Sequence, residues 1–184
     1  MRLFCGIDLT PDVVRALGDL VRMLRPAARI NWSPVENLHI TTKFIGEWPA
    51  ERLEELGKTL APLAAHPPIP IEVRGLGWFP NPHSPRIFWA GVKAPPALAE
   101  LARKTDAALG AIGIPVETRP FSPHLTLARI KSPVPLVELR RHVAALDSTE
   151  FGAFTAQAFH LYLSERHPSG SVYTKLAEFP LSRP

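Results

Sequence analysis

Cysteine is almost absent from this chain of 184 residues. The single cysteine, Cys5, cannot form an intramolecular disulfide, which is typical of proteins of a reducing compartment. Long apolar runs are missing too: none approaches the roughly 18 residues that a membrane span needs. The apolar run after Arg2 is interrupted at Asp8, so no secretory signal is recognisable. We therefore expect a cytoplasmic protein that does not enter a membrane.

The common metal-binding motifs are also missing. The chain contains neither HExxH nor CxxC, and no carboxylate stands beside the motif histidines described below, so we expect no metal site and no cofactor. Lys and Arg outnumber Asp and Glu by 21 to 17, but the basic residues are dispersed and never form a run. This net charge of +4 supports a polyanionic partner only weakly.

Proline, in contrast, is abundant: the chain has 21, about twice average usage. The prolines separate segments with clear hydrophobic periodicity, and 46% hydrophobic residues are enough for a sizeable core. Thr10 and Pro11 have the residue types of a helix start. The pattern predicts strands at about 2–9, 39–45, 71–79, 87–92, 124–129, 154–163 and 172–179, and helices at about 11–25, 53–63, 96–112 and 136–146.

Several landmarks of the first half return in the second half at a constant offset of 85 positions. The pairs are Gly6 and Gly91, Pro11 and Pro96, His39 and His124, and Thr41 and Thr126. One coincidence would mean little, but a shared offset across strand, helix start and motif indicates a duplicated βαβαβ unit. We therefore expect an α+β fold in which residues 1–184 form a single two-lobed domain, with pseudo-twofold related halves at about 1–80 and 86–184.

Each half carries one histidine followed two residues later by a threonine. His39 and Thr41 belong to one predicted strand, and His124 and Thr126 to the other. Since residues i and i+2 of a strand point to the same face, each strand presents an imidazole and a hydroxyl side by side. A single pair of this kind is usually structural. Two pairs related by a pseudo-twofold axis would face each other and form one site.

Such a site suits in-line displacement at phosphorus. That reaction removes a proton from the attacking oxygen on one side and supplies a proton to the leaving oxygen on the other. Histidine can do either, because its ordinary pKa of about 6.5 makes both protonation states accessible near neutral pH. Threonine hydroxyls can donate to the non-bridging phosphoryl oxygens. The pattern predicts a phosphoesterase site, but pseudo-symmetry does not distinguish which histidine is the acid.

Two cations follow the motifs. Arg129 has the opposite strand parity from His124, so it reaches the site only if the strand ends or bulges there; its guanidinium suits phosphate recognition. Lys43 has the parity of His39 and is a candidate to face the anion, although a solvated Lys is the alternative.

Aromatic residues near the motifs are candidates to stack on a nucleobase. These are Phe121 and Tyr173, together with Phe4, and the alternative for each is a place in the core. The remaining histidines share no pattern and are interpreted as surface or satisfied core residues. They are His66, His83, His142, His160 and His167.

The segments just described resemble the RNA 2′,3′-cyclic phosphodiesterase family, historically called 2′-5′ RNA ligases, of the two-histidine phosphoesterase superfamily. The resemblance covers nearly the whole chain. It is carried by the opening strand at 2–4, the motif segments at 37–47 and 119–129, and the tail at 173–181. Thr42 and Ile45 stand where this family usually has leucine, which is a mild change.

This resemblance implies a bilobal α+β fold with two small antiparallel sheets enclosing a central cleft. It also implies metal-independent hydrolysis of the terminal 2′,3′-cyclic phosphate of RNA ends or small nucleotides to a 2′-phosphate, with no obligate protein partner. By the same resemblance His39 is the general acid, His124 activates water, and Thr41 and Thr126 hold the phosphate. Reversal of the reaction would join RNA ends through a 2′-5′ linkage without ATP.

Two other functions remain open at this point. The same cleft could serve a non-catalytic protein that binds RNA ends or nucleotides, which would need hydrogen-bond donors but not two titrating groups. A small His-based metal hydrolase would require stoichiometric metal and would lose activity in EDTA.

Overall fold

The computed structural model describes residues 1–168 and 170–182. Its strands are β1 (Arg2–Asp8), β2 (Asn31–Trp32), β3 (His39–Glu47), β4 (Ile69–Phe79), β5 (Ile87–Lys93), β6 (His124–Arg129), β7 (Glu150–Ala156), β8 (Ala158–His167) and β9 (Gly170–Pro180). Its α-helices are α1 (Pro11–Leu24), α2 (Leu53–Leu60), α3 (Pro96–Gly110) and α4 (Val137–Ala144). Short 3-10 turns occupy Arg25–Ala27, Val35–Asn37, Ala50–Arg52 and Ala61–Ala64.

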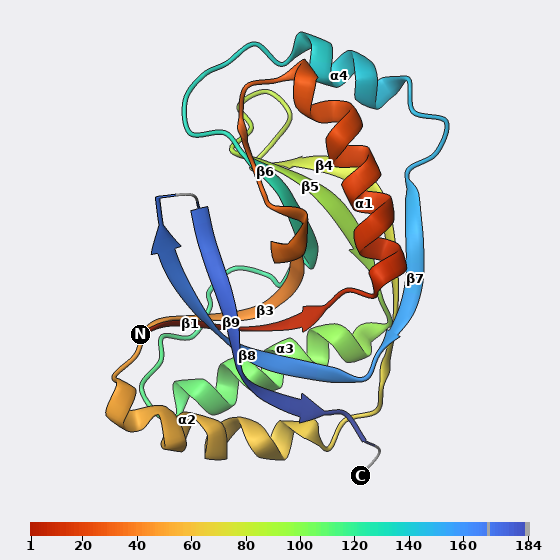
Figure 1. Cartoon of the computed structure of the whole chain (residues 1–184). Helices are drawn as coiled ribbons and strands as arrows, with labels where there is room; N and C mark the ends of the chain where they lie inside the picture. Colours follow the sequence, from red (N-terminus) through yellow and green to blue (C-terminus); the bar gives the residue numbers. More distant parts are fainter. Residues whose placement is uncertain (169, 183–184) are drawn as a thin grey trace.

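The strands form two antiparallel sheets (Figure 1). One sheet has the order β3-β1-β8-β9, and the other has the order β2-β6-β5-β4-β7. Helices α2 and α3 lie together below the four-stranded sheet, while α1 runs along β7 with α4 at its upper end. The predicted α+β class with two antiparallel sheets flanked by helices is confirmed.

Each sheet contains strands from both halves of the chain. Strand β4 follows β1 and β3 in sequence but pairs with β5 and β7 of the second half. Correspondingly, β8 pairs with β1 of the first half. The exchange covers one edge of β1 and one edge of β5 with a strand of the opposite half, so that neither edge is left with unpaired backbone groups.

Two local expectations differ from the structure. The strand expected at 154–163 is two strands, because the chain passes at Gln157 from β7 in one sheet to β8 in the other. Alternation of apolar and polar residues shows which face of a sheet each side chain occupies, but it does not show where the chain passes to another sheet. In addition, the Thr10 side chain makes no capping hydrogen bond to α1, although Pro11 does occupy the first turn of that helix.

Alternate residues of β1 divide between the core and the opposite face of its sheet. Leu3, Cys5 and Ile7 are buried in the core that is shared with the helices. Burial raises the pKa of the Cys5 thiol to about 12, which leaves it protonated and unreactive at neutral pH. The other face carries Phe4 and Asp8 beside the first motif strand. Among the helices described, none is long and apolar enough to cross a membrane.

Candidate active site

The two motif strands, β3 and β6, contact each other although they belong to different sheets. Burial is the largest cause that lowers the pKa of His39, and a positive charge on His124 is the smallest of its causes. Across the ladder, Gly6 pairs with Thr41 and Gly91 pairs with His124. A Cβ atom at Gly91 would lie 2.4 Å from the backbone oxygen of Arg74, so only glycine permits this close approach of β4.

Both histidines are held in the same tautomer by backbone carbonyls. His39 Nδ1 lies 2.7 Å from the carbonyl oxygen of Asn37, and His124 Nδ1 lies 2.8 Å from that of Ser122. Since a carbonyl can only accept, the proton of each neutral imidazole is on Nδ1, and Nε2 carries the free lone pair. Nε2 of His39 lies 3.0 Å from Thr41 Oγ1. Each site histidine is therefore presented with Nε2 as its reactive atom.

The two imidazoles titrate below their ordinary range. Burial lowers the pKa of His39 and of His124, while the Nδ1 bond to the backbone partly counteracts this effect in each case. The positive charge of Arg129 lowers both values further. Arg129 thus lies within electrostatic reach of both motif histidines.

A β-bulge explains how Arg129 gains this position. Thr126 pairs with Trp89 and Ala128 pairs with Phe88, so Leu127 is an extra residue in β6. Leu127 and Ala128 are both buried, and Arg129 returns to the exposed face that carries the motif. The bulge is braced by Ser33, whose N–H donates to the Leu127 carbonyl at 2.8 Å. The bulge that Arg129 needed to reach the site is present.

A second bulge, at the equivalent place in β3, turns Lys43 away from the site. Thr41 pairs with Gly6 and Lys43 pairs with Cys5, so Thr42 is the extra residue. Lys43 is 7% exposed, and its ammonium group donates to the Asp106 carboxylate and to the Pro115 carbonyl. The expectation that Lys43 shares the face of His39 was therefore wrong, because a bulge reverses strand parity. Phe44, at 62% exposure, takes the position equivalent to Arg129.

The aromatic candidates separate into two groups. Tyr173 lies edge-on to His39, with ring centroids 5.2 Å apart, and Phe4 stacks on His39 at 4.5 Å. Phe121 packs partly buried against the hydrophobic core, and no aromatic contact joins it to either histidine in the described part of the chain. Phe79, which the sequence did not indicate, lies edge-on to His124 at 4.9 Å.

A polar cluster that sequence reasoning missed adjoins His39. Asp8, the ladder partner of His39, accepts a hydrogen bond from the Tyr162 hydroxyl and pairs with the Lys175 ammonium group. Burial alone would raise the pKa of Asp8, but the bonds from Lys175 and Tyr162 leave it below its usual range. His160, interpreted from sequence as a default surface or core histidine, is buried, and its Nε2 lies 3.0 Å from Glu178.

The surroundings of the two histidines are thus unequal. The ladder partner of His39 is Asp8, whereas that of His124 is Gly91, so in the described part of the chain no carboxylate takes the place of Asp8 beside His124. Sequence offered one signal: Asp8 is a carboxylate that closes an otherwise apolar strand. The partners that give it a role come from β8 and β9, more than 150 positions away, and only the sheet order brings them together.

The family model described as LigT like Phosphoesterase matches residues 7–89 and again residues 92–173. The chain belongs to this family. The two matched segments begin 85 positions apart, which is the offset of the motif pairs. This LigT-like phosphoesterase has its paired histidines at equivalent places in the two matched segments.

Relatives of this LigT-like phosphoesterase cover its full length. The RNA 2′,3′-cyclic phosphodiesterase of Archaeoglobus fulgidus is 32% identical, with 97% of this chain and 99% of the relative aligned. The protein of that name from Thermus thermophilus is 38% identical, with 98% and 90% aligned. A crystal structure of TT0787 of Thermus thermophilus superposes with a TM-score of 0.82 at 34% identity, covering 98% of both chains.

Proposed function

We propose that this chain is a phosphodiesterase that opens the terminal 2′,3′-cyclic phosphate of RNA ends or nucleotides to a 2′-phosphate. The observation that carries this proposal is the pair of imidazoles presented from two sheets, each held by a carbonyl at Nδ1 so that Nε2 is the reactive nitrogen. Binding alone does not need two titrating groups. The names of the Archaeoglobus fulgidus and Thermus thermophilus relatives support the same substrate.

The reaction needs one histidine in each protonation state. The oxygen of water attacks phosphorus, and the bond from phosphorus to the 3′ oxygen breaks. We assign His124 Nε2 as the group that takes the proton of the water, and His39 Nε2–H as the group that protonates the leaving 3′ oxygen. Both proton transfers use side chains of this chain, and the scheme contains no metal step.

The remaining polar groups of the site would neutralise the phosphate. Thr41 and Thr126 would donate their hydroxyls to its non-bridging oxygens, and Arg129 would supply a positive charge. Burial lowers the pKa of His39, but a bound phosphate anion favours its protonated form. The substrate itself would thereby help to prepare the acid. The same steps with a 5′-hydroxyl in place of water would break the bond from phosphorus to the 3′ oxygen and join the RNA ends through a 2′-5′ linkage.

The test is hydrolysis of an RNA that ends in a 2′,3′-cyclic phosphate, with EDTA present. Loss of either histidine in His39→Ala or His124→Ala should lower kcat by roughly 10² to 10⁴, the usual worth of a general acid or base. His142→Ala is the matched control, because His142 is half-buried on α4 and its Nδ1 bonds to the Glu138 carbonyl of its own helix. Absence of a 2′-phosphate product, or unchanged turnover in both variants, would refute the proposal.

The same experiment addresses the two other functions. A protein that only binds RNA ends would retain binding in both histidine variants and show no turnover in any form. A metal hydrolase would lose its activity in EDTA. Placement in the cytoplasm stays a prediction and is consistent with the buried thiol of Cys5.

A further inference from the structure

A groove of about 320 Å³ lies between the segment that joins β4 to β5 and the segment that leaves β6. Residues 83–86 form one wall, and residues 130–137 form most of the other, with Arg140 of α4 at one end. We call it the Arg86 groove. The mechanism above uses none of its residues.

Positive charge dominates this groove. Its lining includes Arg86 and Arg140 but no aspartate or glutamate. Arg86 is exposed, and no carboxylate in the described part of the chain forms an ion pair with it. Arg140 is held in place, because its guanidinium lies over the Trp78 ring at 4.8 Å and donates to the Pro82 carbonyl. One free and one preoriented guanidinium therefore face the same space.

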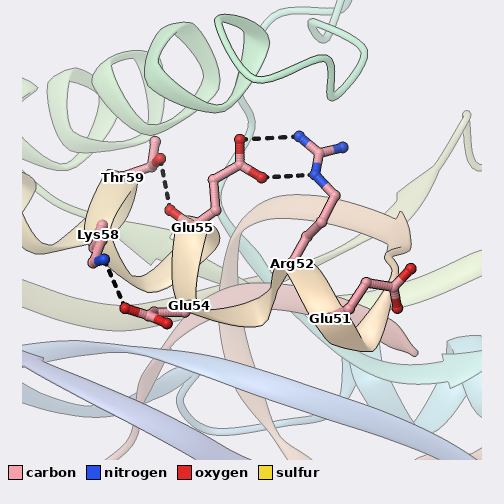
Figure 2. A pocket seen from close by; sticks show the side chains of 6 residues that line it. All are labelled: Glu51, Arg52, Glu54, Glu55, Lys58 and Thr59. Carbon is pink, nitrogen blue, oxygen red and sulfur yellow. Dashed lines mark hydrogen bonds and ion pairs between the residues drawn. The ribbon is translucent and has the colours of Figure 1, made fainter.

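A second surface pocket, on α2, has a different distribution of charge from the Arg86 groove. Figure 2 shows that its cations are already paired: Arg52 with Glu55, and Lys58 with Glu54. Glu51 adds a third carboxylate to two cations, so the α2 pocket repels an anion. The Arg86 groove has the opposite character.

Apolar side chains complete the groove. Val137 is 73% exposed, which is unusual for its type, and Pro133 and Val134 lie beside it in the lining. Guanidinium groups next to an exposed apolar wall match a nucleotide chain, since the phosphates need cations and the bases need an apolar surface. A protein partner would need no excess of cations here.

The groove continues directly from the candidate active site. The Arg86 N–H donates to the Phe79 carbonyl at 2.6 Å, and the Phe79 ring contacts His124. On the other wall, the Ile130 N–H donates to the Arg86 carbonyl at 2.9 Å, and Ile130 directly follows Arg129. An RNA strand whose 3′ end lies between the histidines could therefore place its preceding nucleotides in this groove.

We infer that the Arg86 groove binds the phosphodiester backbone on the 5′ side of the cyclic phosphate, so that oligoribonucleotides are the preferred substrates and cyclic mononucleotides are poor ones. This inference rests on the proposed function for its substrate end. It adds a second contact region, which a mononucleotide is too short to reach.

The test compares a 2′,3′-cyclic mononucleotide with a short oligoribonucleotide that ends in the same cyclic phosphate. We expect the wild type to favour the oligonucleotide in kcat/KM, and Arg86→Gln to lower that preference about fivefold to tenfold through KM, the effect of one charge-assisted contact. Kinetics on the mononucleotide should stay within about twofold of wild type. Arg103→Gln removes an equally exposed charge from α3 and should change neither substrate.

Salt dependence gives an independent measurement that does not need turnover. Binding of an oligoribonucleotide with a 3′-phosphate, followed by fluorescence anisotropy, should lose about 0.7 from the slope of log affinity against log salt in Arg86→Gln, as expected for one single-strand phosphate contact. If the wild type hydrolyses neither substrate but its salt slope still differs from that of Arg86→Gln, the proposed function is refuted and RNA binding in the groove is supported. Equal slopes and equal oligonucleotide preference in Arg86→Gln and wild type would refute the inference that the Arg86 groove binds the RNA backbone.

Discussion

At the scale of single residues, the site combines two equivalent imidazoles with unequal neighbours. His39 and His124 share one tautomer and one kind of backbone bond, which follows from the duplication. Arg129 acts on both, whereas Asp8 raises the pKa of His39 and is no cause of the shift at His124. The pH dependence of activity can separate these two influences.

The first prediction concerns Arg129. Because its charge lowers the pKa of both histidines, Arg129→Gln should raise both values. The acid limb of kcat/KM reports the base, and the alkaline limb reports the acid. Both limbs of the bell-shaped dependence of kcat/KM on pH should therefore move to higher pH. Loss of a charged contact to phosphate should also lower kcat/KM by roughly tenfold to a hundredfold. A variant whose limbs stay in place would show that Arg129 is remote from the histidines.

The second prediction concerns Asp8 and decides which histidine is the acid. Asp8→Asn removes the carboxylate that favours protonated His39, so the pKa of His39 should fall and that of His124 should stay. If His39 is the acid, only the alkaline limb of kcat/KM moves, and it moves to lower pH. NMR titration of the imidazole protons provides the direct measurement.

Tyr162→Phe is the matched control for Asp8→Asn. It removes the hydroxyl that donates to Asp8 but keeps the carboxylate, so the limb should move less. Movement of the acid limb instead would identify His39 as the base and exchange the two assigned roles. Equal movement of both limbs would contradict the asymmetry between the histidines.

At the scale of elements, the sequence predicts where strands and helices lie but not where strands bulge. The positions of β3 and β6 follow from apolar alternation, and their histidine and threonine share a face as expected. The extra residues Thr42 and Leu127 interrupt that alternation, because a buried pair replaces the in-out pattern. The parity of Lys43 changes as a result, and Arg129 reaches the site. A bulge depends on the partner strand, which one strand's sequence does not reveal.

The third prediction concerns the ion pair that links β3 to α3. The Lys43 and Asp106 side chains are 6% and 19% exposed, so Asp106→Ala would leave a buried ammonium group without its counterion. The free energy of unfolding should fall by about 3 kcal/mol. Urea denaturation provides the measurement. The double variant Lys43→Met with Asp106→Leu should recover most of the loss, because neither charge then remains buried.

Activity distinguishes this structural role from a role in the site. The folded double variant should keep kcat within about twofold of wild type, since Lys43 contacts α3 and not the phosphate position. A loss of kcat as large as that of the histidine variants would return Lys43 to the catalytic machinery.

At the scale of the whole molecule, the duplication was readable from the sequence and the strand exchange was not. The offset of 85 relates the halves, but it does not state which sheet the third strand of each half joins. The single strand expected at 154–163 is for this reason two strands, β7 and β8, in different sheets. The contact between Asp8 and Tyr162 was not predicted for the same reason, because β1 pairs with β8 only through the strand exchange.

The fourth prediction follows from the exchange: the two sheets should unfold together. Removing a core side chain from β8 in Leu161→Ala should destabilise the protein by about 2–5 kcal/mol, because Leu161 is 1% exposed. Trp32, Trp78 and Trp89 all lie in the other sheet, so fluorescence largely reports that sheet. Since β4 and β8 tie each half to the opposite sheet, the fluorescence and far-UV CD transitions should coincide in urea, and both should shift by the same amount in Leu161→Ala. Independent lobes would instead give a fluorescence transition that Leu161→Ala leaves in place, which would contradict the cooperative unit that the topology implies.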